Sequence, residues 1–255
     1  MADRAAGRWF ACRERNPGAA ARLYCFPHSG GAAGEYVRWA DHLPDVEVWG
    51  LQLPGRGGRQ GERPLTRMPE LVGALVAEAA FDGRFALFGH SLGALVAYEL
   101  ARALGAAGRR SPAWLFASAY PAPHLPRGAP PVHHLADAEL VERIDRTYGS
   151  LPAEVRADAE LLALVLPAYR ADLTMVETYE HVPGEPLDCP LTVIAGTDDE
   201  ATEAQLTAWR RHTTGPFALR WLPGGHFYLR EQRDALLAIV ADSLRSDAAG
   251  ARASG

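Results

Sequence analysis

The sequence contains little cysteine and no long apolar run. Only three of its 255 residues are cysteines, Cys12, Cys25 and Cys189, and they are widely spaced with no CxxC pair. This spacing argues against a disulfide framework and against a zinc site, and it is typical of proteins in a reducing compartment. No stretch of about 18 apolar residues is present, and the N-terminal ten residues have no apolar signal core. We therefore expect a soluble, cytoplasmic protein without a membrane-spanning segment.

The sequence also lacks a strong charge of either sign. Its formal net charge is −5, and no basic stripe stands out that would favour binding to nucleic acid. The segment SGGAAG, residues 29–34, has neither the G-x-G-x-x-G spacing nor the downstream acidic residue of a dinucleotide site. His133 and His134 are adjacent, but no third ligand has a plausible spacing, which favours a solvated loop over a metal site. We expect no cofactor and no metal.

Short runs of β-branched and aromatic residues recur along the chain and predict strands. They cover residues 22–26, 46–53, 84–89, 113–119, 191–196 and 217–222, and residues 8–14 could form one more. Several runs are apolar on both faces, which is typical of a parallel sheet covered by helices on each side. Helical patterns lie between them, at residues 68–81, 92–107, 203–213 and 231–246. This alternation predicts a doubly wound α/β fold.

One segment interrupts the alternation. Roughly seventy residues separate the predicted strands at 113–119 and 191–196, and they carry helical patterns at 137–149 and 156–179 instead of strands. A structureless loop of this length is unusual in a compact domain. We therefore expect a helical insertion over residues 125–185, of the kind that forms lids over active sites. Residues 1–124 and 186–245 would form the discontinuous core domain, and 246–255 a disordered tail.

A serine between two glycines follows the third of the main predicted strands. Gly89-His90-Ser91-Leu92-Gly93 stands before an apolar helical pattern, although glycine weakens both strands and helices. Strand, G-x-S-x-G and helix together form the nucleophile elbow, a strained turn that exposes the serine hydroxyl at the sheet edge. The alternative is a structural serine in a glycine-rich turn. We interpret Ser91 as the candidate nucleophile.

A serine nucleophile needs a base and a carboxylate that orients the base. In this fold the chain order is Ser, then Asp or Glu, then His. His226 follows the last predicted strand behind a glycine pair, and its alternative is a packed or solvated loop histidine. The G-x-x-D spacing after the strand at 191–196 selects Asp199 as the acid. Asp198 remains a rival, and either aspartate could be only a helix N-cap.

Two backbone N–H groups would stabilise the oxyanion. Leu92, the residue after the nucleophile, supplies one. The loop after an early strand should supply the other, and alignment on Pro27-His28-Ser29-Gly30-Gly31 selects the N–H of Ser29.

The ordered set of motifs resembles the type II thioesterases of polyketide and non-ribosomal peptide assembly lines. It consists of FPHSGG, LPGRGGR (53–59), GHSLGALVAYELA, RADL (170–173), GTDD and PGGHFYL, and it runs from about residue 22 to residue 229. No single motif is specific, but the set distinguishes the chain from general lipases. This chain has His28 where the family usually has tyrosine or a similar residue.

The resemblance implies an α/β-hydrolase fold, a mostly parallel sheet flanked by helices, with a helical lid. It implies a monomeric enzyme without cofactor or metal, which removes aberrant acyl groups from the phosphopantetheine arm of acyl or peptidyl carrier proteins. Ser91, Asp199 and His226 would form the triad, and Ser29 and Leu92 the oxyanion hole. The alternatives are a small-ester carboxylesterase with the same triad and a non-catalytic relative that binds an acyl ligand.

Two further groups of residues invite hypotheses. Arg56, Arg59 and Arg63 lie in a glycine-rich loop, where one could contact the phosphate or an acidic face of the carrier, or all could be solvated. Apolar residues of the insertion could line an acyl channel or form the core of the lid. They are Leu161, Leu162, Leu164, Val165, Leu166 and Met175.

Overall fold

The apolar runs of the sequence form a seven-stranded sheet. The computed structural model describes residues 8–149 and 151–253. The strand order is β1-β3-β2-β4-β5-β6-β7, with β1 antiparallel to β3 and all other neighbours parallel. The strands are β1 (Phe10–Ala11), β2 (Ala21–Phe26), β3 (Val46–Leu51), β4 (Phe85–His90), β5 (Trp114–Ser118), β6 (Leu191–Gly196) and β7 (Phe217–Leu222). The six predicted strands and the additional one near the start are confirmed.

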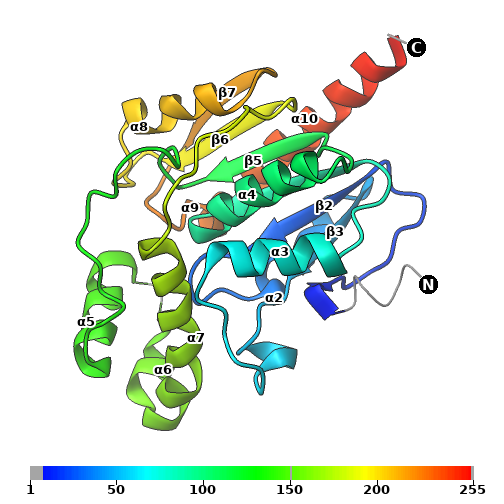
Figure 1. The fold of residues 1–255 in the computed structure, drawn as a ribbon. Helices are drawn as coiled ribbons and strands as arrows, with labels where there is room; N and C mark the ends of the chain where they lie inside the picture. Colours follow the sequence, from blue (N-terminus) through cyan, green and yellow to red (C-terminus); the bar gives the residue numbers. More distant parts are fainter. Residues whose placement is uncertain (1–7, 150, 254–255) are drawn as a thin grey trace.

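Helices cover both faces of the sheet, as Figure 1 shows. Every residue of β3, β4 and β6 is buried, which explains why their sequences are apolar on both faces. One core cluster joins the sheet to α3 (Met68–Glu78), α4 (Leu92–Ala106) and α8 (Glu203–Thr207). A second cluster on the other face joins it to α2 (Ala33–Tyr36), the 3₁₀-helix η1 (Val37–His42), α9 (Tyr228–Glu231) and α10 (Arg233–Ala253). The doubly wound architecture is confirmed.

The parallel strands bring their following loops to one edge of the sheet. The loop after β2 leads to α2, the loop after β4 leads directly into α4, and the loops after β6 and β7 lead to α8 and α9. In open α/β sheets this carboxyl edge is where ligands bind. The predicted triad and oxyanion residues, Ser29, Ser91, Leu92, Asp199 and His226, all follow the ends of these four strands.

Between β5 and β6 the described residues contain helices and no strand. These are α5 (Asp137–Tyr148), α6 (Ala153–Ala157) and α7 (Ala159–Glu177), which lie together to one side of the sheet in Figure 1. They have an apolar cluster of their own, which includes Leu140, Ile144, Leu166, Tyr169 and Leu173. The helix predicted over 156–179 is divided at Asp158, because the Asp158 side chain accepts hydrogen bonds from the first N–H groups of α7 and caps it.

The segment expected to be a disordered tail, residues 246–255, has helical backbone as far as Ala253. Helix α10 continues to that residue, and residues 254–255 lie outside the described part of the chain. The segment is small and polar but rich in alanine, which has the highest helix propensity of all residues, and its backbone extends a helix that is already formed. No helix within the described residues is both long and apolar enough to span a membrane.

Candidate active site

Ser91 lies at a sharp turn between β4 and α4. Its backbone angles are φ 56° and ψ −120°, a conformation that residues other than glycine rarely adopt. The turn is fixed on one side by the Ser91 N–H, which donates to the carbonyl oxygen of Ser118 at the end of β5, 2.8 Å away. Ser91 is only partly buried. This is the backbone geometry that the nucleophile elbow requires.

The two glycines of the elbow are required by close backbone contacts. A Cβ atom on Gly89 would lie 2.0 Å from the carbonyl oxygen of Gly93. A Cβ atom on Gly93 would lie 1.9 Å from the carbonyl oxygen of Phe26, the last residue of β2. Because backbone cannot yield as a side-chain end can, no other residue fits at either position. The contact with Phe26 also packs the loop after β2 against the elbow.

The structure brings His226 and Asp199 together at the same edge. His226 Nδ1 lies 3.2 Å from both carboxylate oxygens of Asp199, and the Asp199 side chain is only 6% exposed. The loops that carry them are in direct contact, since a Cβ atom on Gly196 would lie 2.3 Å from the carbonyl oxygen of Gly224. Asp198 is exposed, so the geometry favours Asp199 over its neighbour as the partner of His226.

The predicted oxyanion donors lie on the two loops that meet at the elbow. Leu92 is the first residue of α4, where a backbone N–H has no acceptor within the helix. Ser29 lies in the loop after β2, within a turn closed by the Gly31 N–H and the carbonyl oxygen of His28 at 2.9 Å. The oxyanion roles of both residues stay predictions.

Comparison with known proteins identifies the family. Residues 21–244 match the thioesterase domain family. Thioesterase PikA5 of Streptomyces venezuelae is 41% identical over 93% of this chain and 86% of its own length. The gramicidin S biosynthesis protein GrsT of Aneurinibacillus migulanus is 34% identical over 93% of this chain and 94% of its own. The solved structure of the type II thioesterase BorB from the borrelidin biosynthetic cluster has 43% identity and a TM-score of 0.84, over 92% of this chain and 97% of that chain.

The chain belongs to the thioesterase domain family. The resemblance to type II thioesterases and the expected α/β-hydrolase fold are confirmed.

Two buried histidines of this thioesterase, His28 and His90, lie near His226, and the sequence predicts no catalytic role for either. The His90 ring centroid lies 5.1 Å from that of His226, and His90 Nδ1 lies 2.8 Å from Ser118 Oγ. Burial holds the pKa of His90 well below its usual range. Burial, with Arg230 and His226 nearby, lowers the pKa of His28 to about 3. Both rings are therefore neutral near pH 7 and do not compete with His226 for a proton.

Two of the three arginines of the glycine-rich loop, of which one could contact a carrier protein, are paired within the fold. Arg59 is buried and donates to both carboxylate oxygens of Glu62. Arg56 is 12% exposed and donates to both carboxylate oxygens of Asp172 on α7. Only Arg63 is exposed. Sequence spacing could not reveal the Arg56–Asp172 pair, because 116 residues separate its two members.

The apolar residues of the insertion do not share one environment. Leu166 belongs to the insertion's own core, and Met175 to the core on the α4 face of the sheet. Leu161 and Leu164 are 39% and 48% exposed. Core packing thus accounts for Leu166 and Met175, whereas Leu161 and Leu164 lie at the surface.

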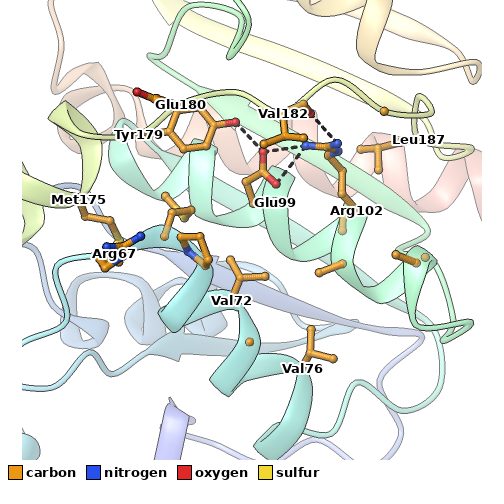
Figure 2. A pocket seen from close by; sticks show the side chains of 18 of the residues that line it. Arg67, Val72, Val76, Glu99, Arg102, Met175, Tyr179, Glu180, Val182 and Leu187 are labelled. Atoms are coloured by element: carbon orange, nitrogen blue, oxygen red, sulfur yellow. Dashed lines mark hydrogen bonds and ion pairs between the residues drawn. The ribbon is translucent and has the colours of Figure 1, made fainter.

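Figure 2 shows a groove that the sequence analysis did not predict. It has a volume of about 1570 Å³ and runs between α3, α4 and the segment after α7. Met68, Val72 and Met175 are among its apolar lining residues, and Tyr179 donates a hydrogen bond to Glu99 at its side. None of Ser91, Asp199 and His226 lines this groove, so it is separate from the candidate active site.

A cluster of histidines at the base of the insertion also escaped prediction. His212 Nε2 lies 2.7 Å from His124 Nδ1, and its Nδ1 lies 2.8 Å from the hydroxyl of Tyr98. Burial, followed by the neighbouring His124 and His181, lowers the pKa of His212 to about 3. In the part of the chain that the structure describes, no group of three His, Cys, Asp or Glu side chains is placed to hold a metal ion.

Proposed function

We propose that this thioesterase hydrolyses acyl thioesters on the phosphopantetheine arm of carrier proteins, through a Ser91–His226–Asp199 triad and an acyl-enzyme intermediate. The observation that carries the proposal is the pairing of His226 with a nearly buried Asp199, at the sheet edge where Ser91 forms a strained elbow. The proposal of carrier-bound substrates is supported by the relatives, because BorB and PikA5 are named as thioesterases and BorB belongs to a biosynthetic cluster.

Acylation begins when Ser91 Oγ attacks the thioester carbonyl carbon and His226 takes the hydroxyl proton. The N–H groups of Ser29 and Leu92 stabilise the negative oxygen of the tetrahedral intermediate. The carbon–sulfur bond then breaks, the phosphopantetheine sulfur receives the proton from His226, and the acyl group stays on Ser91.

Deacylation repeats these steps with water. A water molecule attacks the carbonyl carbon of the acyl-enzyme while His226 takes one of its protons. The second tetrahedral intermediate collapses when the bond between this carbon and Ser91 Oγ breaks and His226 returns the proton to Ser91 Oγ. The products are the free acid and the restored enzyme. Asp199 holds the His226 imidazole in one orientation and stabilises the imidazolium that forms in both steps.

The biological role within this proposal is editing. A discrete enzyme that removes aberrant acyl groups would return stalled carrier proteins to use, and its partner would be an acyl or peptidyl carrier protein. We also propose that the enzyme acts as a monomer in the cytoplasm. The three cysteines, Cys12, Cys25 and Cys189, are all free thiols, which supports a location in a reducing compartment.

The test is deacylation of carrier protein followed by intact-protein mass spectrometry. Carrier protein is loaded with acetyl, propionyl or longer acyl groups and incubated with the wild-type enzyme or with Ser91→Ala. Loss of the acyl mass with the wild type alone supports the proposal, and the order of rates gives the chain-length preference. If the wild type cleaves simple esters but leaves every loaded carrier intact, the proposed substrate is wrong and a small-ester carboxylesterase is the better description.

A further inference from the structure

Helix α7 of the insertion reaches the loop that carries Ser29. Asp172 on this helix is buried, with a side chain only 2% exposed. Its Oδ2 accepts a hydrogen bond of 2.8 Å from the backbone N–H of Gly30. Both carboxylate oxygens also accept hydrogen bonds from Arg56, each of 2.6 Å. A single carboxylate thus connects the insertion, the loop after β3 and the loop after β2.

Arg56 holds the same loop from the other side. Besides its two bonds to Asp172, its guanidinium donates to the carbonyl oxygen of Gly31 at 3.0 Å. The pair therefore binds two consecutive residues of the loop, Gly30 through its N–H and Gly31 through its carbonyl oxygen. Both residues follow Ser29 directly in the chain.

Packing fixes the loop as well. Gly30 has φ +77°, and a Cβ atom there would lie 2.2 Å from a ring carbon of Tyr169, which is one turn before Asp172 on α7. The loop is thus pressed against the helix at the residue whose N–H Asp172 accepts. A displacement of Asp172 or Arg56 would leave this contact without its polar partners.

These contacts determine the direction of the Ser29 N–H. The carbonyl of His28 and the N–H of Ser29 belong to one planar trans peptide, so they point in opposite directions. That carbonyl accepts the N–H of Gly31, the residue whose own carbonyl Arg56 holds. Fixing Gly30 and Gly31 therefore orients the peptide group that presents the Ser29 N–H.

We propose that Arg56 and Asp172 are positioning residues that hold the loop after β2 so that the Ser29 N–H meets the developing oxyanion. This inference rests on the proposed function, in which Ser29 is an oxyanion donor. A buried ion pair is weak evidence for stability as such, because apolar residues of similar volume often stabilise equally well. Its bidentate geometry does define position, and oxyanion donors act only when they are held in place before the reaction.

The first variant is Asp172→Asn, assayed with an acyl p-nitrophenyl ester. The amide retains the shape of the side chain but turns one acceptor oxygen into a donor that faces Arg56. We expect kcat to fall about 10²-fold, the size of effect that a misplaced catalytic group produces. KM should change less than about threefold, because the donor acts in the transition state and not on bound ester.

A transition-state analogue separates positioning from general damage. An alkyl trifluoromethyl ketone adds to Ser91 and places a negative oxygen where the oxyanion forms. Its inhibition constant should rise by the same factor by which kcat/KM falls in Asp172→Asn. A merely structural role would lower the fraction of active enzyme and leave the inhibition constant of the remaining enzyme unchanged.

Matched controls lie on the same elements. Glu177→Gln also converts a carboxylate of α7 to an amide, since the Glu177 side chain is buried and accepts hydrogen bonds from His133 and not from the loop after β2. It should leave kcat within about twofold. If Asp172→Asn does not fold, Arg56→Lys and Arg59→Lys provide a second pair. Both arginines lie in one loop and bind a carboxylate with two hydrogen bonds, but only Arg56 reaches Gly31.

The outcomes separate the two proposals. If Ser91→Ala is inactive and folded Asp172→Asn or Arg56→Lys keeps kcat and the inhibition constant within about twofold of the wild type, the positioning proposal is wrong and the triad stands. If loaded carriers are not cleaved but the ester assay shows the expected losses, the proposed substrate is wrong and the positioning proposal stands.

Discussion

Ser91 has a strained backbone conformation, and its side chain makes no capping hydrogen bond that would stabilise it. Such outliers cost about 1–3 kcal/mol and persist only where the surrounding structure fixes them. Here the Ser91 N–H donates to the carbonyl oxygen of Ser118, and Gly89 packs directly against the backbone of Gly93 on the other side of the turn. The glycines therefore weaken two regular elements so that one hydroxyl can stand at the sheet edge.

The adjacent aspartates allow a matched test of the acid. Asp199→Asn should lower kcat by about 10³–10⁴-fold, because the amide favours the wrong imidazole tautomer and cannot stabilise the imidazolium. Asp198→Asn should stay within about twofold of the wild type, since Asp198 is exposed and His226 pairs with its neighbour. Steady-state hydrolysis of an acyl p-nitrophenyl ester measures both. Equal losses in the two variants would contradict the assignment of Asp199.

At the scale of elements, α4 carries two glycines in opposite surroundings. Gly93→Ala would place a Cβ atom 1.9 Å from the carbonyl oxygen of Phe26, whereas Gly105→Ala would meet no atom within 4 Å. We expect Gly93→Ala to separate β2 from the elbow and to lose both stability and activity. Gly105→Ala should keep full activity and gain about 0.4–1 kcal/mol from the lower entropy of its unfolded chain.

Urea unfolding and ester hydrolysis of both variants check this expectation. A Gly93→Ala enzyme with wild-type activity would show that the close contact is not required for the site.

The elements were predictable where their signals are local. The strands of the sheet are continuous apolar runs, and α3 has apolar residues at helical spacing that face the core, including Leu71, Val72 and Leu75. Ser91 and His226 could be selected because each lies in a short motif directly after a strand. The end of α10 is not marked by a local signal, because residues 246–253 are small and polar although several are alanines with high helix propensity.

What remained beyond prediction depends on contacts between distant parts of the chain. Asp172 belongs to the recognised RADL motif, but only the structure shows that it meets Arg56 and Gly30, which lie 116 and 142 residues away. The groove beside α3 and α4 is likewise formed by three separate segments. Such contacts depend on the packing of the insertion against the core, which no local pattern specifies.

At the scale of the whole molecule, the interior contains histidines that must stay neutral. His28 and His212 have pKa values lowered to about 3, and burial also holds the pKa of His90 well below its usual range. Near pH 7 these imidazoles are mostly neutral in the unfolded chain as well as in the folded chain, so they cost the fold little stability. As the pH falls below about 6.5, the unfolded chain binds protons that the folded chain excludes, so stability is lost.

This linkage predicts a steep loss of stability in acid. Each such histidine should lower the free energy of unfolding by about 1.4 kcal/mol per pH unit between its unfolded and folded pKa values. His28→Gln should therefore reduce the loss between pH 7 and pH 5 by about 2 kcal/mol, as measured by urea unfolding. His134→Gln, at an exposed histidine, is the control and should follow the wild type. An unchanged loss in His28→Gln would mean that His28 is not held neutral by the fold.

The central claim is that loops from β4, β6 and β7 assemble Ser91, Asp199 and His226 into one reactive site. Its most direct test is labelling with an alkyl fluorophosphonate, with the adduct located by peptide mass spectrometry. We expect one adduct on Ser91 in the wild type, none at that position in Ser91→Ala, and labelling slowed by about 10²-fold or more when His226→Ala removes the base. An adduct elsewhere, or labelling of His226→Ala at the wild-type rate, would contradict the account.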